Sequence, residues 1–313
     1  MKIVFLDRKS IGIDLDLSEF EQFGQVVIYD YSKVEEIPER VEDADIIILN
    51  KMPINEATIG KAKHLKLVCV TATGTNNLDK EYLDRAGIAW RNVAGYSTEA
   101  VAQHTFALLF YLMEHLNYYD NYVKSEKYVD DSMFTHFDQH FNELSHKKWG
   151  IIGLGNIGNR VAQIATCFGA DVSYYSTSGK NNDDTYPQVD FDTLLSQSDI
   201  VSIHAPLNAD TEGLIDKNAL DKMKSTAILI NVGRGPIIVE KDLAEALKSG
   251  KIAAAGLDVL SAEPMEKDNP LREIKDSDKL FITPHIAWAA VEARVRLMHI
   301  IAGQIKDFIE ENK

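Results

Sequence analysis

Short runs of β-branched and other apolar residues alternate with amphipathic segments along almost the whole chain of 313 residues. This alternation is typical of parallel sheets whose strands are joined by crossover helices, so it predicts an α/β fold. The first part of the chain is predicted to contain strands at Lys2–Leu6, Val26–Tyr29, Ile46–Leu49, Leu67–Val70 and Ile88–Trp90. The second part is predicted to contain strands at Trp149–Ile152, Val172–Tyr175, Ile200–His204, Ala227–Asn231, Ala254–Asp258 and Leu280–Thr283. Two doubly wound, Rossmann-like domains account for both sets.

The last amphipathic segment, Ala289–Glu310, follows the final predicted strand and has no strand of its own. We expect it to pack on the first domain, which makes that domain discontinuous. The predicted boundaries are residues 1–97 with 286–313 for the first domain and residues 98–285 for the second. A helix that begins at Thr98 is apolar over most of its surface, which indicates a position between domains or between subunits.

Composition and charge argue against several classes of partner. The chain has 33 basic and 48 acidic residues and a formal net charge of −15, which repels nucleic acid and anionic lipid surfaces. Its longest apolar run, Phe106–Met113, is far shorter than the roughly 20 residues that span a bilayer. The N-terminus lacks the features of a secretory signal, and Cys69 and Cys167 stand in apolar surroundings typical of buried, reduced thiols. We therefore expect a cytoplasmic protein.

A dinucleotide-binding motif occupies the start of the second domain. Gly153, Gly155 and Gly158 form a G-x-G-x-x-G pattern directly after an apolar strand and at the opening of a helix. The first glycine permits a tight turn, the second permits close approach of a pyrophosphate, and the third permits close packing of helix on strand. The helix that begins at Asn156 and Ile157 would direct its backbone N–H groups at the phosphates. The alternative interpretation is a glycine-rich turn without a ligand.

The residues that would meet the adenosine ribose decide which nicotinamide cofactor is favoured. An NAD site usually has a carboxylate at the end of the second strand, about 20 residues beyond the glycines. Here that position holds Ser176, Thr177 and Lys180 within the run Tyr175-Ser-Thr-Ser-Gly-Lys. Hydroxyls and an ammonium can bind a 2′-phosphate, so we expect NADP(H) to be favoured, with NAD(H) possible.

Three side chains near predicted strand ends can supply the chemistry of 2-keto acid reduction. Arg234 follows one strand, and its planar guanidinium matches a carboxylate. His285 follows the last strand and could donate a proton to the substrate oxygen, with Glu263 as a partner that favours the charged imidazolium. Taken singly, each residue also has a purely structural interpretation. Arg234 could be a surface arginine, His285 a packed histidine and Glu263 a loop carboxylate.

The chain resembles the D-isomer-specific 2-hydroxyacid dehydrogenases, and within them the glycerate dehydrogenase or hydroxypyruvate/glyoxylate reductase branch. The resemblance rests on TATGTNNLD at 71–79, GIIGLGNIG at 150–158, HAPLN at 204–208, NVGRG at 231–235, GLDVLSAEP at 256–264 and TPHIAWA at 283–289. It implies a substrate domain built from both ends of the chain with the cofactor domain inserted, and a homodimer through the helix starting at Thr98. It also implies an oxidoreductase that reduces a small 2-keto acid to the D-2-hydroxy acid, most simply hydroxypyruvate or glyoxylate.

The resemblance assigns roles residue by residue. It implies that Arg234, Glu263 and His285 are the catalytic set. Further cofactor contacts are implied at Pro206, Val232, Gly233 and Asp258. Substrate contacts are expected at Lys51, Met52, Thr73, Gly74, Thr75 and Trp288, besides Arg234. A bulky indole at Trp288, three residues after His285, would favour small substrates, although packing of the terminal helix is an equal alternative.

Other interpretations remain open at this stage. A D-lactate or phenylpyruvate-type reductase would use the same fold, whereas formate dehydrogenase would pair its histidine with glutamine, and phosphoglycerate dehydrogenases often carry a regulatory domain. An NAD(H)-sensing, corepressor-like scaffold is an alternative of another class. Histidines at 136, 140 and 146 superficially suggest a metal site, but the expected chemistry needs no metal.

Overall fold

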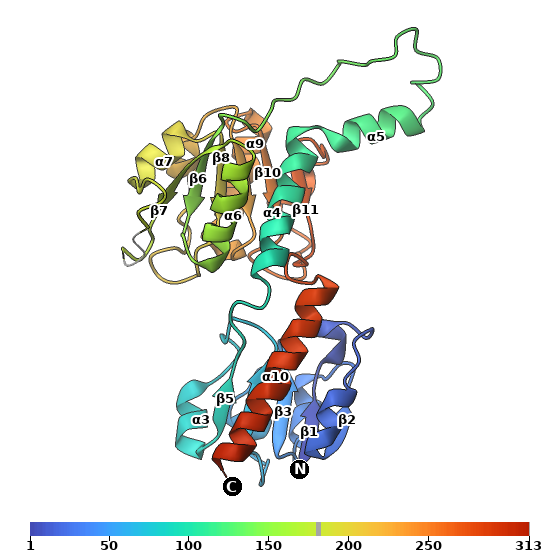
Figure 1. Cartoon of the computed structure of the whole chain (residues 1–313), viewed down its shortest axis with the longest axis vertical. Coiled ribbons are helices and arrows are strands. Elements are labelled where there is room, and N and C mark those ends of the chain that lie inside the picture. The colour runs from blue at the N-terminus through green and yellow to red at the C-terminus, as the bar shows by residue number, and fades with distance from the viewer. Residues whose placement is uncertain (180–182, 313) are drawn as a thin grey trace. The chain divides into compact units, whose positions relative to one another are not determined.

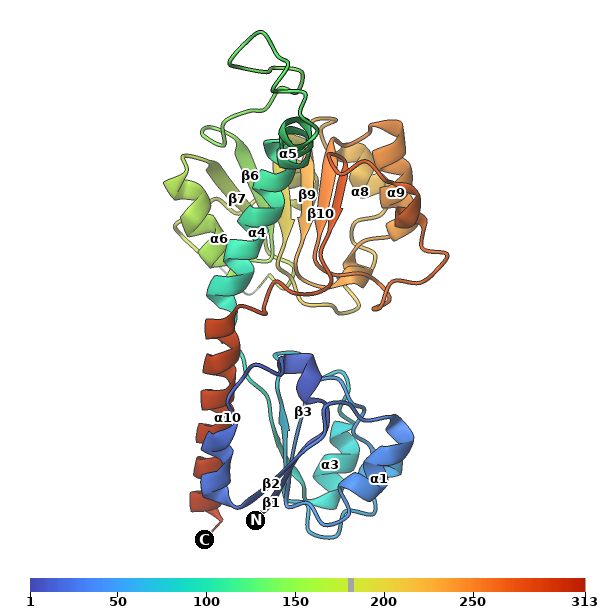
Figure 2. The same ribbon diagram turned by 90° about the vertical axis from the view of Figure 1, so that its right-hand side faces the viewer.

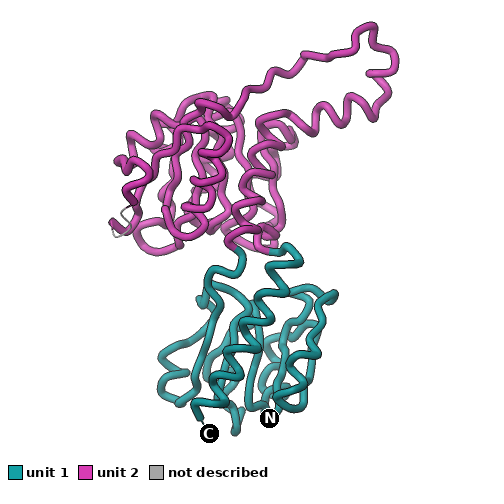
Figure 3. Tube along the Cα trace, in the orientation of Figure 1, with its two compact units in different colours: residues 1–97, 289–313 teal, residues 98–288 magenta. Residues whose placement is uncertain are grey.

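The structure, a computed structural model, describes residues 1–179 and 183–312. It divides into two compact units, unit 1 (Met1–Ser97 and Ala289–Lys313) and unit 2 (Thr98–Trp288), which Figure 3 distinguishes by colour. Each unit is built on one parallel sheet with interleaved helices, which confirms the predicted α/β fold class. In the described part of the chain, no helix combines the length and the apolar character needed to cross a membrane.

The part of unit 1 that the structure describes contains five short parallel strands. They are β1 (Lys2–Phe5), β2 (Gln25–Ile28), β3 (Ile46–Leu49), β4 (Leu67–Val70) and β5 (Ala89–Arg91), in the order β2-β1-β3-β4-β5. Its helices are α1 (Ile37–Arg40), α2 (Glu56–Ile59), α3 (Lys80–Ala86) and α10 (Val291–Glu311), with 3-10 turns η1 (Arg8–Ile11), η2 (Ser18–Phe23) and η3 (Val34–Glu36). Strands β3 and β4 are buried along their whole length, because helices cover both faces of the sheet.

The two ends of the chain meet in unit 1. Figure 2 shows α10 on one face of its sheet and α1 and α3 on the other. Arg294 of α10 fixes the helix to the N-terminal part of the chain, since its guanidinium donates to Asp14 at 2.6 and 2.9 Å and to the Ile11 carbonyl at 3.1 Å. The C-terminal helix, which was predicted to have no strand of its own, thus forms a layer of unit 1.

The described residues of unit 2 form six parallel strands. They are β6 (Lys148–Ile152), β7 (Asp171–Tyr175), β8 (Ile200–Ile203), β9 (Ile228–Asn231), β10 (Ala254–Leu257) and β11 (Leu280–Ile282), in the order β11-β10-β9-β8-β6-β7. The helices are α4 (Thr98–Met113), α5 (Leu116–Lys124), α6 (Asn156–Cys167), α7 (Phe191–Gln197), α8 (Lys217–Lys222) and α9 (Glu240–Ser249), with 3-10 turns η4 (Gly235–Ile237) and η5 (Pro270–Glu273). The strand order reverses between β6 and β8, which is where doubly wound sheets bind ligands.

The apolar helix α4 packs inside unit 2. Half of its residues are buried: Val101, Ala102, Thr105, Phe106, Leu108, Leu109, Leu112 and Met113. Leu108 and Leu112 lie so close to β10 that a Cβ on Gly256 would meet them at 3.1 and 3.3 Å. Figure 2 shows α4 and α6 on one face of this sheet and α8 and α9 on the other. The apolar character of α4 is therefore accounted for by its own sheet.

The expectation of two buried thiols is only half right. Cys69 is buried on β4, and burial raises the pKa of its thiol to about 12. Cys167, however, is exposed at the end of α6. The buried positions of α6 are Gly158, Val161, Ala162 and Ala165, and position 167 falls on the opposite side of a helix with 3.6 residues per turn. The prediction for Cys167 was wrong because an apolar neighbourhood in sequence does not fix the side of a helix.

Candidate active site

The three candidate catalytic residues follow three neighbouring strands of unit 2. Arg234 lies after β9, Glu263 after β10 and His285 after β11, and these strands pair in parallel in the order β11-β10-β9. Because all the strands run in one direction, the loops that carry these residues leave the same edge of the sheet. The glycine motif after β6 leaves that edge as well, so the predicted cofactor and catalytic residues share one end of unit 2.

His285 and Glu263 form a hydrogen-bonded pair. His285 Nδ1 lies 2.7 Å from Glu263 Oε2, and the other carboxylate oxygen accepts the Leu260 N–H at 3.0 Å. The carboxylate thus orients the ring. Since Nδ1 is engaged by Glu263, a proton would be exchanged with a substrate through Nε2. The His285 backbone has a positive φ of 56°, a left-handed conformation that residues other than glycine rarely adopt.

Arg234 stands in a tightly packed turn. Its Nη1 donates to the Gly233 carbonyl at 2.8 Å, while Asn231 donates from its amide to the Arg234 carbonyl at 2.9 Å and accepts the Gly233 N–H at 3.0 Å. The next residue, Gly235, is pressed against the loop after β10, since a Cβ there would lie 1.9 Å from the Leu260 carbonyl carbon. This contact brings the loop of the arginine against the loop that leads to Glu263.

Asp258 is buried beneath the segment that bears His285. Its Oδ1 accepts the Ile286 N–H at 2.8 Å and the Thr283 hydroxyl at 2.6 Å, and its Oδ2 accepts the Ala287 N–H at 2.8 Å. Its backbone carbonyl accepts the His285 N–H, also at 2.8 Å. The resemblance implied a contact with the nicotinamide, which stays a prediction. The structure adds a supporting role that sequence reasoning missed.

The three motif glycines lie in three different surroundings. Gly153 has a φ of +88°, and a Cβ there would lie 2.9 Å from the backbone of Ala205, across the switch point. A Cβ on Gly158 would lie 2.2 Å from the Gly153 carbonyl, so the helix packs directly on the turn. A Cβ on Gly155, in contrast, would meet no described atom within 4 Å. Gly155 therefore borders open space at the start of α6, which fits a pyrophosphate.

The remaining predicted cofactor residues of unit 2 line the same sheet edge. Asn156 and Ile157 are the first residues of α6, and Asn156 is exposed. Pro206 is exposed after β8, whereas Val232 is buried after β9 and Gly233 is held by Asn231. These backbone positions are consistent with a dinucleotide bound across the strand ends.

At the ribose end, Ser176 directly follows β7. Ser176 is 8% exposed, and its hydroxyl is buried without a hydrogen-bond partner among the described residues. A buried hydroxyl without a partner is costly, so an external ligand at this position would relieve the cost. Thr177 is half-buried beside it. Lys180, the third predicted contact, lies outside the described residues.

Trp288 folds back on the histidine segment. Its indole N–H donates to the His285 carbonyl at 2.9 Å, and its ring packs partly buried against the core on the α4 side of the sheet. The indole thus fixes the end of this segment. Whether it also narrows a substrate pocket stays a prediction.

The predicted substrate residues of unit 1 follow β3 and β4. Lys51 and Met52 come after β3, in a loop held by two side chains that sequence reasoning missed. Asp7 accepts the N–H groups of Asn50 at 2.9 Å and of Lys51 at 2.8 Å, and Asn77 donates to the Met52 carbonyl at 2.8 Å. Burial raises the pKa of Asp7. The available signal was an aspartate placed directly after a buried strand.

The loop after β4 carries Thr73, Gly74 and Thr75. Thr73 donates through its hydroxyl to the Val93 carbonyl at 3.0 Å, and its own carbonyl accepts from the Asn92 amide at 2.7 Å. Gly74 and Thr75 are half-buried. The structure therefore brings these three residues and Lys51–Met52 to one edge of the unit 1 sheet.

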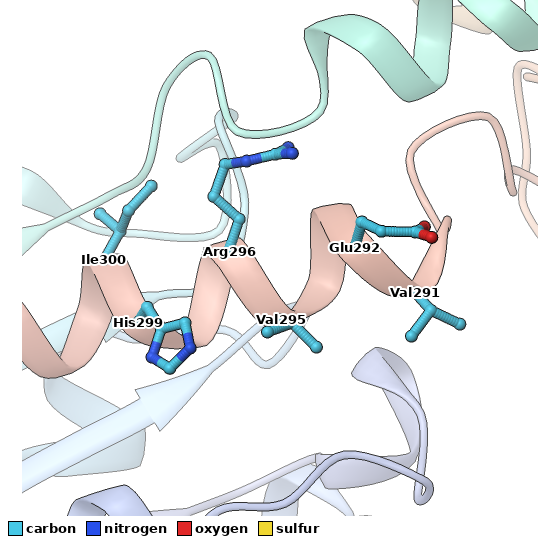
Figure 4. Close-up of a pocket in the computed structure, with 6 residues that line it drawn as sticks. All are labelled: Val291, Glu292, Val295, Arg296, His299 and Ile300. Carbon is cyan, nitrogen blue, oxygen red and sulfur yellow. The ribbon is translucent and has the colours of Figure 1, made fainter.

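A shallow pocket lies elsewhere in unit 1, on the outer surface of α10. Figure 4 shows Val291 and Val295 along one side of the helix and Arg296 pointing to the other. Arg296 donates to the Tyr96 carbonyl at 2.5 Å. The pocket contains none of the predicted site residues; its lining is Val291, Glu292, Val295, Arg296, His299 and Ile300.

Comparison with known proteins places this site in a family. Residues 106–287 match the model of the D-isomer specific 2-hydroxyacid dehydrogenase, NAD binding domain. A hydroxypyruvate reductase of Blautia hydrogenotrophica is 39% identical over 99% of this chain and 97% of its own length. A glycerate dehydrogenase of Methylorubrum extorquens is 37% identical over 99% of this chain and 95% of its own. The resemblance to this branch of the family is confirmed.

Solved structures agree over the whole length. An acyclic imino acid reductase in complex with NADPH and D-Arg has a TM-score of 0.85 at 31% identity, covering 99% of this chain and 98% of that one. D-lactate dehydrogenase from Aquifex aeolicus, complexed with NAD and lactic acid, has a TM-score of 0.84 at 26% identity, covering 99% and 96%. The prediction that the cofactor is a nicotinamide dinucleotide is therefore confirmed. The chain belongs to the D-isomer specific 2-hydroxyacid dehydrogenases, NAD-dependent oxidoreductases that act on the CH–OH group of 2-hydroxy acids.

Proposed function

We propose that this enzyme reduces a small 2-keto acid, hydroxypyruvate or glyoxylate, to the D-2-hydroxy acid, with His285 as the proton donor. The observation that carries the proposal is the 2.7 Å contact between His285 Nδ1 and Glu263 Oε2 at the end of three adjacent strands. The names of full-length relatives, a hydroxypyruvate reductase and a glycerate dehydrogenase, favour a small substrate.

Each residue of the catalytic set has a distinct task. The Arg234 guanidinium binds the substrate carboxylate through two parallel N–H donors and polarises the neighbouring carbonyl. His285 gives its Nε2 proton to the carbonyl oxygen as that oxygen gains negative charge, and Glu263 stabilises the imidazolium beforehand. When bound, the reduced nicotinamide supplies the hydride for the carbonyl carbon. Lys51, Met52, Thr73, Gly74 and Thr75 of unit 1 stay predicted substrate contacts.

The test is a panel of initial rates with hydroxypyruvate, glyoxylate, pyruvate and phenylpyruvate, followed through the absorbance of the reduced nicotinamide. We expect the first two acids to have the highest kcat/KM. A preference for pyruvate or phenylpyruvate would instead establish a D-lactate or phenylpyruvate-type reductase. Cofactor binding without turnover of any acid would favour the corepressor-like scaffold.

For the cofactor, NADP(H) is the favoured partner. The support is the buried Ser176 hydroxyl, which has no partner among the described residues, at the strand end where an NAD site usually has a carboxylate. Replacing Ser176 by aspartate introduces that carboxylate and should turn the preference toward NADH, because the charge repels a 2′-phosphate. Ser176→Ala is the matched control, since it removes the hydroxyl without adding charge. An unchanged ratio of NADPH to NADH affinities in both variants would refute the assignment.

We also propose that the enzyme is a homodimer through the helix that starts at Thr98, with further contact through the arm that follows it, residues 116–143. Figure 1 shows α5 and the segment after it extending away from the unit 2 sheet. Large apolar side chains are exposed there, with Phe134 at 83%, Phe137 at 73% and Phe141 at 58%. These three rings offer about 400 Å² of the roughly 800 Å² per partner that a stable interface buries. Half of the residues of the helix starting at Thr98 are buried within unit 2, and the other half are not.

Light scattering coupled to gel filtration tests the assembly. The wild-type chain should elute with twice the monomer mass, and the double variant Phe134→Ser, Phe137→Ser should elute as a monomer. Tyr31→Ser is the control, because Tyr31 is an aromatic residue of unit 1 that is 62% exposed and lies outside the arm. A monomeric wild-type chain at micromolar concentration would contradict the proposal.

A further inference from the structure

The segment that carries His285 is held in an unusual backbone conformation. His285 has a φ of +56°, and its N–H donates to the carbonyl of Asp258 at 2.8 Å. The next two N–H groups, of Ile286 and Ala287, both donate to the Asp258 carboxylate at 2.8 Å. A left-handed non-glycine residue persists only where its surroundings determine it, and here one aspartate supplies the acceptors for three successive N–H groups.

Asp258 is in turn fixed by a chain of hydrogen bonds that ends on α4. The Thr283 hydroxyl donates to Asp258 Oδ1 at 2.6 Å, which uses its single proton. The Thr283 oxygen lies 2.9 Å from His104 Nε2, so it accepts there and the histidine donates. His104 Nε2 is also 3.6 Å from Asp258 Oδ1. The direction of the protons therefore requires His104 to carry a hydrogen on Nε2.

We propose that His104 is a positioning residue for the reaction, acting through Thr283 and Asp258 to hold the left-handed segment that presents the His285 imidazole. The proposal rests on the proposed role of His285 as proton donor. His104 touches none of the predicted reacting groups. It is anchored on α4, a helix packed on the sheet of unit 2, and so ties the segment to the rigid part of the unit.

The environment of His104 suits a fixed neutral donor. Its side chain is 18% exposed and that of Asp258 is 1% exposed. Burial lowers the pKa of His104, although the Asp258 charge works in the opposite direction. The neutral ring with hydrogen on Nε2 can donate to Thr283 without bringing a second charge into the buried network.

Two substitutions of His104 separate positioning from packing. In His104→Gln, the amide nitrogen takes the place of Nε2 and can still donate to Thr283. In His104→Leu, a side chain of similar bulk removes the donor. Thr105→Val is the control, because among the described residues the buried Thr105 hydroxyl bonds only to the Val101 carbonyl of its own helix, at 2.9 Å. Each variant is measured for kcat and KM, for cofactor affinity by fluorescence, and for amide hydrogen exchange in the peptide covering residues 283–288.

For His104→Leu we expect faster exchange in that peptide and a fall in kcat of about 10- to 100-fold, the scale of a misplaced catalytic group, with cofactor affinity unchanged. His104→Gln should restore both the exchange rate and kcat, and Thr105→Val should match the wild type. Unchanged exchange in His104→Leu, or a loss in His104→Gln as large as in His104→Leu, would overturn the proposal. Faster exchange with normal kcat would leave His104 a positioning residue for the segment while refuting the proposed role of His285.

Discussion

Replacing Glu263 by glutamine should lower kcat/KM while leaving the fold in place. Glutamine keeps the length of the side chain and one acceptor for His285 Nδ1, 2.7 Å away, but it removes the negative charge. A charge-assisted hydrogen bond is worth about 1.5–3 kcal/mol and a neutral one about 0.5–1.5 kcal/mol. Because the His285 and Glu263 side chains are 26% and 35% exposed, we take about 1–1.5 kcal/mol for the lost charge, which is about 5- to 13-fold in kcat/KM.

Steady-state rates with the preferred keto acid and cofactor measure this effect, with cofactor affinity measured separately. The control is Glu240→Gln, because Glu240 holds the same loop through the Ser261 N–H at 2.6 Å and does not act on His285. We expect Glu240→Gln to stay close to the wild type. If Glu263→Gln keeps kcat/KM within about twofold, or if both variants lose activity equally, the carboxylate does not stabilise a charged imidazole and the reasoning fails.

Three further outcomes follow from the structure. Gly155→Ala should keep wild-type thermal stability but weaken cofactor binding measured by fluorescence titration, whereas Gly153→Ala should lower the melting temperature, because its Cβ would lie 2.9 Å from Ala205. Arg234→Lys should raise KM for the keto acid at least about tenfold in steady-state assays, since an ammonium cannot make two parallel hydrogen bonds to a carboxylate. Burial lowers the pKa of His104 in the folded chain below 6.5, so the unfolded chain binds this proton first as the pH falls. The free energy of unfolding, measured in urea, should therefore fall more between pH 6.5 and about pH 5 for the wild type than for His104→Gln.

The sheet architecture could be predicted because apolar strand runs are local signals. The predicted strands Ile46–Leu49 and Leu67–Val70 coincide with β3 and β4, and other strand ends differ by a residue. The glycine motif could also be predicted from the sequence, because its strand, turn and helix are contiguous around Gly153. The placement of His285 beside Glu263 was expected from a resemblance, because no local pattern joins residues 22 positions apart.

What the sequence did not reveal depends on contacts between distant segments. Asp258 binds backbone N–H groups at 286 and 287, and Asp7 binds those at 50 and 51, so neither role has a signature in the neighbouring residues. The burial of α4 on its own sheet and the exposure of Cys167 depend on how a helix is rotated about its axis. Hydrophobicity alone leaves that rotation open when apolar residues surround most of a helix.

The discontinuous build of unit 1 has a consequence for synthesis on the ribosome. The sheet strands of this unit are complete by residue 97, but α10, which buries Leu297, Ile301 and Ile305, begins only at residue 291. At about 5–20 residues per second, the intervening 193 residues, 98–290, take about 10–40 s to appear. Unit 2 is continuous and can fold in that interval, so nascent chains stalled before residue 291 should show a protease-resistant unit 2 and a protease-sensitive unit 1. Until α10 emerges, the apolar face that it covers is open to chaperones and to other nascent chains.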